Sequence, residues 1–195
     1  KNLLLMSSSR TSSDQGWLHH AEADITRFLK DQGVDKVTFV PYAGVVIPHD
    51  MYVGMARERF KKMGFALDAV SEGDPQEMIQ HAEAIVVGGG NTVVLTKLMH
   101  ERAIMDAIRE RVGNAGIPYL GWSAGAGVAG PTLCTTNDWP IQEPPSFKTL
   151  DVFPVQMNPH YRDPVILSDE IRERCASQLA ELFSAVPALA DELNN

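Results

Sequence analysis

The stretch Tyr119-Leu120-Gly121-Trp122-Ser123-Ala124-Gly125-Ala126-Gly127 decides the expected fold. Residues 118–120 close an apolar run typical of a buried strand, and the small residues after Ser123 can begin a helix. A serine at such a sharp strand-to-helix turn is strained, and its hydroxyl projects above the edge of the sheet. The flanking glycines are expected because a Cβ there would collide with the neighbouring strand or helix. An ordinary glycine-rich turn is the alternative interpretation. The motif therefore indicates a catalytic serine only together with further catalytic residues elsewhere in the chain.

Apolar segments alternate with amphipathic ones along the rest of the chain. Strands are expected at 3–6, 36–41, 65–70, 84–87 and 118–120. Helices are expected at 17–30, 51–63, 75–81 and 93–112, the last as one helix or two. Strands that are apolar throughout and separated by helices predict a parallel sheet covered on both faces. We therefore expect an α/β, doubly wound, mostly parallel fold, with residues 1–195 as a single domain.

The composition of the chain argues against several kinds of partner and against a bound metal. The chain has 195 residues, 44% of them hydrophobic, which is enough to bury the core of one domain. A net charge of −8 argues against nucleic acid or an anionic membrane surface as a partner, and no apolar run is long enough to span a membrane. Cys134 and Cys175 form no disulfide framework and suit a reducing cytoplasm, and no Cys/His cluster has zinc spacing. We expect a cytoplasmic protein without a bound metal.

A second glycine-rich loop, Gly88-Gly89-Gly90-Asn91-Thr92, follows the strand expected at 84–87. In doubly wound folds the working site lies at the carboxyl ends of the strands, so this loop and the Ser123 turn should share one edge. The loop lacks the motifs of nucleotide sites, which predicts no nucleotide cofactor. It can instead face the nucleophile, with Asn91 and Thr92 placed to bind polar groups of a substrate.

Two backbone N–H groups are candidates for an oxyanion hole beside Ser123. Ala124 supplies the first N–H of the expected helix, which points at an oxyanion formed next to the serine. Gly90, in the facing loop, is our choice for the second donor.

A general base is expected from a later strand end. The short apolar segment 153–157 is stopped by Asn158-Pro159, and His160 stands at its tip. An acid should orient His160 and stabilise its imidazolium form, and Asp138 lies between the serine and the histidine in a polar loop. A plain Asx turn before a proline explains Asp138 equally well. The other helix-associated histidines fit surface positions better.

Several motifs resemble, in order and spacing, those of the peptidase E family, which also includes the cyanophycinases. They are Phe39-Val40-Pro41-Tyr42-Ala43-Gly44, Val87-Gly88-Gly89-Gly90-Asn91-Thr92, Gly121-Trp122-Ser123-Ala124-Gly125-Ala126, Thr135-Thr136-Asn137-Asp138 and Asn158-Pro159-His160. The resemblance implies a cytoplasmic serine peptidase with a fold related to class I glutamine amidotransferases, acting without a cofactor on dipeptides with an N-terminal aspartate (Asp-X). Carried over by motif, Ser123 is the nucleophile and His160 the base. Gly90 and Ala124 form the oxyanion hole, and Asp138 matches a functionally important acid.

The C-terminal part departs from the family. In the family, the arginine of a Glu-x-Arg-Glu motif receives the substrate aspartate. Glu170-Ile171-Arg172-Glu173 resembles this motif, so Arg172 is the first candidate for that role and Arg174 the second. A solvated helix face is the alternative. The chain ends at Asn195 without the family's further strands, one of which carries a triad glutamate. We therefore favour Asp138 over Glu192 as the acid.

Three other functions compete with an aspartyl dipeptidase. A cyanophycinase-like hydrolase would use the same groups on β-aspartyl peptides. An esterase of the α/β-hydrolase type shares the Gly-x-Ser-x-Gly turn but has a different oxyanion loop. A catalytically impaired binding homologue follows if the triad acid is missing. A homodimer is possible, and the sequence leaves the oligomeric state open.

Overall fold

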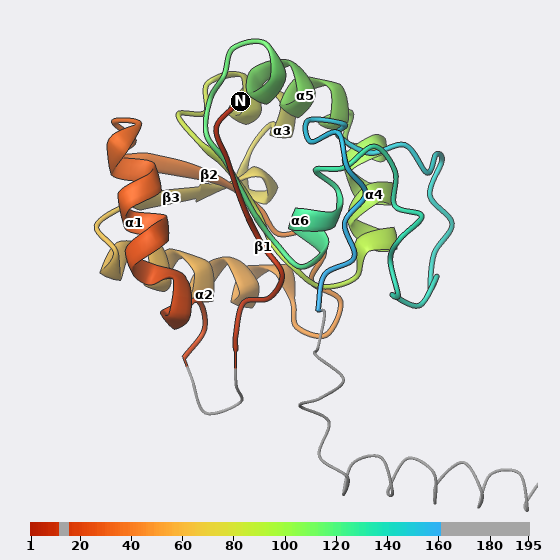
Figure 1. The fold of residues 1–195 in the computed structure, drawn as a ribbon, viewed down its shortest axis with the longest axis horizontal. Coiled ribbons are helices and arrows are strands. Elements are labelled where there is room, and N and C mark those ends of the chain that lie inside the picture. Colours follow the sequence, from red (N-terminus) through yellow and green to blue (C-terminus); the bar gives the residue numbers. More distant parts are fainter. Residues whose placement is uncertain (12–15, 161–195) are drawn as a thin grey trace, which may run out of the picture. The chain divides into compact units, whose positions relative to one another are not determined.

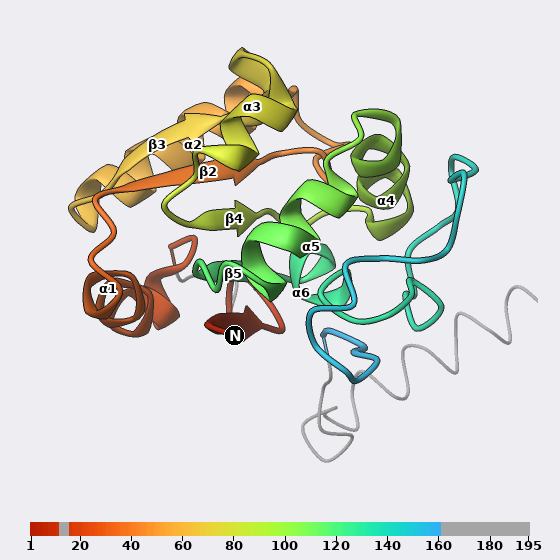
Figure 2. The same ribbon diagram turned by 90° about the horizontal axis from the view of Figure 1, so that it is seen from above.

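One parallel sheet runs through the part of the chain that the computed structural model describes, residues 1–11 and 16–160. In chain order its strands are β1 (Leu3–Met6), β2 (Lys36–Val40), β3 (Ala66–Ala69), β4 (Ile85–Val87) and β5 (Tyr119–Trp122). They are arranged in the order β1-β5-β4-β2-β3, and every neighbouring pair is parallel (Figure 2). Parallel neighbours need crossover connections, which the helices supply. The parallel sheet expected from the sequence is confirmed.

Helices cover both faces of this sheet (Figures 1 and 2). The helices packed on one face are α1 (Glu22–Asp31) and α2 (His49–Lys62). Those on the other are α3 (Pro75–Gln80), α4 (Thr92–Glu101), α5 (Met105–Gly113) and α6 (Ala124–Gly127). The fold of the described part is therefore doubly wound, as predicted.

The helices lie in their expected segments, with shifts at their ends. Segment 93–112 forms two helices rather than one, because Ala103 takes a left-handed backbone with φ of 53°, which an α-helix cannot include. The segment expected to be helical from residue 17 starts with a short 3-10 helix, His19–Ala21, and α1 follows it. The last strand runs two residues further than expected and ends at Trp122, directly before the serine.

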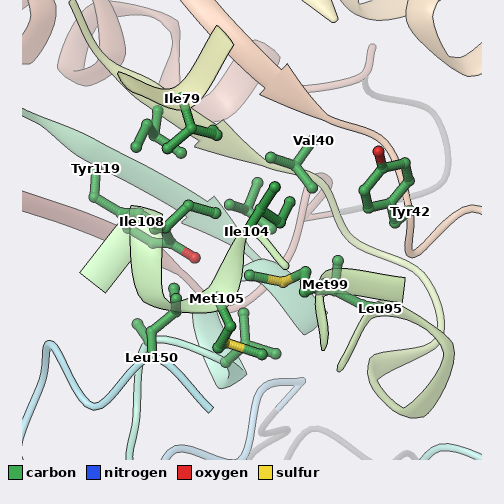
Figure 3. Close-up of a cluster of buried hydrophobic side chains, with 14 of the residues drawn as sticks. Val40, Tyr42, Ile79, Leu95, Met99, Ile104, Met105, Ile108, Tyr119 and Leu150 are labelled. Atoms are coloured by element: carbon green, nitrogen blue, oxygen red, sulfur yellow. The ribbon is translucent and has the colours of Figure 1, made fainter. Parts of the chain in front are cut away.

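Side chains alternate between two cores along each strand. Ile85 and Tyr119 face the α3–α6 side, whereas Val86 and Leu120 face α1 and α2. Figure 3 shows Tyr119 within the first of these clusters. The second core is aromatic near the carboxyl ends of the strands. There the rings of Phe39 and Trp122 stack, with centroids 6.0 Å apart. This alternation explains why the strands are apolar at nearly every position.

Tyr119 couples the first core to the turn after β5. Its hydroxyl, fully buried, donates to Gly125 O over 2.5 Å, and burial raises the pKa of Tyr119 so that this donor stays protonated. Tyr119→Phe should lower the free energy of unfolding by about 1–3 kcal/mol, because it leaves a buried carbonyl without a partner. Urea denaturation measures the change. Tyr42→Phe is the control, since Tyr42 is also buried but its hydroxyl makes no hydrogen bond within the described residues. Equal losses in the two variants would contradict the prediction.

Candidate active site

The turn between β5 and α6 has the strained geometry expected of it. Ser123 has φ of 53° and ψ of −117°, a region that residues with a side chain rarely occupy. A Cβ on Gly121 would lie 2.3 Å from Gly125 O, and one on Gly125 would lie 2.1 Å from Val87 O. Both glycines are therefore required by close approach of backbone, as the sequence predicted. The crowding keeps the turn tight and leaves the Ser123 side chain partly exposed at the carboxyl edge of the sheet.

His160 lies beside the serine. Ser123 Oγ is 2.7 Å from His160 Nε2, which is hydrogen-bond distance. The two residues are 37 positions apart in the chain, and no helix or strand is described between Val152 and His160. The structure thus brings together the serine and the histidine singled out by the sequence. A hydroxyl hydrogen-bonded to an imidazole nitrogen is the arrangement that activates a serine as a nucleophile.

The second glycine loop packs directly against this pair. A Cβ on Gly89 would lie 2.9 Å from Ser123 Cβ, so only glycine fits between loop and turn. Three hydrogen bonds hold the loop: Gly88 N–H to Val40 O, the Tyr52 hydroxyl to Gly89 O, and Asn91 N–H to Ala43 O. Burial raises the pKa of Tyr52, so its hydroxyl remains a donor. The loop is therefore held in place beside the nucleophile.

Two N–H groups near Ser123 are without a partner in the described part of the chain. No backbone hydrogen bond there uses the N–H of Gly90 or of Ala124. Ala124 is the first residue of α6, whose initial N–H groups have no acceptor within the helix. Gly90 has φ of 143°, and a Cβ on it would lie 2.0 Å from Ala43 O. An oxyanion hole requires unpaired backbone donors, and these two lie at the start of α6 and in the loop that packs against the turn.

Asn91 and Thr92 are occupied by protein partners. The Asn91 side chain caps α4 by accepting Val94 N–H over 3.0 Å, and its amide donates to Trp139 O over 2.9 Å. The Thr92 side chain is almost wholly buried, and its hydroxyl donates to Asp138 Oδ2 over 2.6 Å. These contacts shape the start of α4. The expectation that both side chains also bind substrate stays a prediction.

Asp138 is bonded to the start of α4 and not to the histidine. Its Oδ2 accepts Thr92 N–H over 2.7 Å, the Thr92 hydroxyl, and the Thr136 hydroxyl over 3.0 Å. Over residues 1–11 and 16–160 no hydrogen bond joins Asp138 to His160. The orienting role expected of Asp138 is thus not supported, because its carboxylate satisfies the unpaired donors at a helix N-terminus.

The remaining candidates for the site lie outside the described residues. These are Arg172 and Arg174, expected to bind the substrate aspartate, and Glu192, the alternative acid.

The structure adds three site residues that the sequence analysis missed. Ser7 Oγ accepts the His160 N–H over 2.7 Å. Thr135 donates to Met157 O over 2.5 Å, and Asn137 donates to Asn158 Oδ1 over 2.9 Å. All three hold the segment that carries the histidine. The position of Ser7 directly after an apolar strand at the working edge was the one available sign of its role.

The described part of the chain lacks two other kinds of feature. No group of three or more His, Cys, Asp or Glu side chains there is arranged to hold a metal ion. None of the helices described is both long enough and apolar enough to cross a bilayer.

Comparisons with known proteins connect this geometry to a family. Residues 3–190 match the sequence model of peptidase family S51. A peptidase E of Actinobacillus pleuropneumoniae is 45% identical over 162 residues, which are 83% of this chain and 68% of the relative. The peptidase E of Haemophilus influenzae is 44% identical, over 83% of this chain and 73% of its own. A probable alpha-aspartyl dipeptidase of Drosophila melanogaster is 42% identical, over 84% of this chain and 68% of its own.

A solved structure shares the fold. A putative peptidase E protein from Listeria monocytogenes superposes with a TM-score of 0.67, covering 91% of this chain and 87% of that one. The sequences are 23% identical, so this likeness concerns the fold. It agrees with the expected class I glutamine amidotransferase-like α/β architecture.

Proposed function

The chain belongs to peptidase family S51, and from this premise we propose that it is a serine dipeptidase that hydrolyses dipeptides with an N-terminal aspartate. The observation that carries the proposal is the 2.7 Å approach of Ser123 Oγ to His160 Nε2 at a strained strand-to-helix turn. The aspartate preference rests on the name of the Drosophila relative and on the sequence resemblance.

In the proposed mechanism His160 Nε2 takes the proton of Ser123 as Oγ attacks the carbonyl carbon of the scissile peptide bond. The N–H groups of Gly90 and Ala124 stabilise the oxyanion, and each such donor is worth about 2.7–4 kcal/mol in comparable sites. The peptide C–N bond then breaks, and His160 gives its proton to the departing amine. Water attacks the resulting ester with His160 again as base, which releases the aspartate and restores the serine.

A panel of four substrates tests the proposal against its competitors. We expect turnover of Asp-Leu and little turnover of Ala-Leu, β-Asp-Arg or p-nitrophenyl acetate. Preference for β-Asp-Arg would instead indicate a cyanophycinase-like hydrolase, and preference for the ester an esterase. Absence of turnover on all four would indicate a binding homologue and would contradict the proposal.

Gly90→Ala should lower kcat/KM for Asp-Leu by about 10²–10³-fold, the usual cost of losing one oxyanion donor. The reason is steric: the new Cβ would lie 2.0 Å from a backbone oxygen, so the loop must move and carry its N–H away. Gly113→Ala is the matched control, because no atom lies within 4 Å of a Cβ at the end of α5. Steady-state kinetics of both variants are compared. Wild-type rates for Gly90→Ala would exclude the loop as a donor.

We propose, from the sequence, that Arg172 binds the substrate aspartate. Arg172→Ala should then cost about 2–5 kcal/mol in kcat/KM for Asp-Leu, because a charged hydrogen-bonded contact is lost. Ala-Leu, which lacks the carboxylate, should be hydrolysed at the wild-type rate. Equal losses on both substrates would make Arg172 structural and would direct the same test to Arg174.

We also propose a cytoplasmic location, because the exposed free thiol of Cys134 suits a reducing compartment.

A further inference from the structure

The carboxyl end of β1 holds both members of the Ser123–His160 pair through two adjacent residues. Met6 O accepts the Ser123 N–H over 2.9 Å, and Ser7 Oγ accepts the His160 N–H over 2.7 Å. Met6 is itself fixed in the sheet opposite Trp122. One planar peptide joins Met6 to Ser7. Through the two hydrogen bonds, the backbones of Ser123 and His160 are therefore both attached to adjacent residues at the end of β1.

We infer that Ser7 is a positioning residue that sets the place of His160 opposite Ser123. The inference rests on the proposed function, since it concerns the geometry of the same reaction. Ser7 acts through the backbone N–H of the histidine, so its effect should appear in the chemical step rather than in substrate binding.

His160 depends on this contact more than its neighbours do. Hydrogen bonds to residues 156–158 come from the loop 132–137 and do not reach the histidine. They join Thr132 to Gln156, Thr135 to Met157, and Asn137 to Asn158. Among the described residues, Ser7 provides the one hydrogen bond to the backbone of His160. His160 also has φ of 67°, a conformation that persists in a non-glycine residue only when its surroundings impose it.

Loss of the Ser7 hydroxyl should therefore let the imidazole move away from the nucleophile. A displacement of about 1 Å in a catalytic group costs about 10²-fold in rate, so we expect Ser7→Ala to lower kcat by about 10–100-fold with KM unchanged. Ser7→Thr, which keeps the hydroxyl at an exposed position, should retain kcat within a few-fold of wild type.

Ser8→Ala is the matched control. Ser8 lies in the same loop, its hydroxyl accepts the N–H of Arg10 over 3.2 Å, and no hydrogen bond joins it to residues 153–160 in the described part of the chain. Steady-state kinetics on Asp-Leu and thermal unfolding of the three variants are compared with wild type. The inference is overturned if Ser7→Ala has the kcat of Ser8→Ala, if it raises KM at constant kcat, or if Ser7→Thr is as slow as Ser7→Ala.

An NMR experiment separates failure of this inference from failure of the proposed function. The chain has six histidines, and ¹⁵N-histidine labelling gives one backbone amide signal for each, of which that of His160 is absent in His160→Ala. In Ser7→Ala the His160 amide and ring signals should shift, and in Ser8→Ala they should stay in place. If the wild-type chain hydrolyses no Asp-X dipeptide, the proposed function fails while this spectrum still tests the role of Ser7. If the chemical shift of the His160 amide in Ser7→Ala equals that of the wild-type chain, the inference about Ser7 is overturned.

Discussion

Ser123→Ala should lower kcat/KM for Asp-Leu by about 10⁶-fold, the size of loss seen when a serine peptidase loses its nucleophile. The substitution removes the oxygen that would form the acyl-enzyme and leaves the proposed oxyanion donors in place. A residual acceleration of about 10³–10⁴ over water is expected from those donors and from substrate binding.

The same substitution should leave the stability of the fold nearly unchanged. Within the described part of the chain the Ser123 side chain makes one hydrogen bond, to His160, and the strained backbone angles are imposed on serine and alanine alike. Thermal unfolding and kinetics on Asp-Leu are measured together. A folded variant that keeps more than about 1% of wild-type kcat/KM would rule out Ser123 as the nucleophile, because the loss would be about four orders of magnitude smaller than expected.

His160→Ala should produce a loss comparable with that of Ser123→Ala. Without an imidazole at 2.7 Å, the hydroxyl has no described base to take its proton, and the leaving amine has no acid. Nucleophile and base act as one unit, so the two effects should not add: the double variant should be about as slow as either single variant.

The control for this experiment is His81→Ala. His81 is an exposed histidine whose Nδ1 lies 2.9 Å from Glu77 O at the end of α3. It should keep wild-type kinetics on Asp-Leu. If His160→Ala retained substantial turnover, or if the double variant were slower than the single variants by the product of their effects, His160 would not be the base for Ser123.

Features that depend on local sequence could be predicted without the structure. The turn at Ser123 was recognisable because a strand that runs straight into a helix leaves room only for glycine at positions 121 and 125, and the chain has glycine at both. The parallel sheet followed from strands that are apolar on both faces, since each face must be covered. His160 was expected just past a strand end, but no strand is described in residues 152–160, so its approach to Ser123 comes from a loop and not from the shared edge of parallel strands.

The partners of polar side chains were decided only by the tertiary structure. Asp138 was expected to orient His160, but its carboxylate meets the N-terminus of α4, where it accepts hydrogen bonds from the backbone N–H and the hydroxyl of the buried Thr92. The contact between Ser7 and His160 joins residues 153 positions apart. Such pairings depend on the position that each long loop takes against the rest of the fold. A hydrogen bond is lost once its donor and acceptor move apart by more than about an ångström beyond their usual distance, so a small error in that position changes the partner. Periodicity and motif spacing describe the chain near each residue and cannot specify that separation.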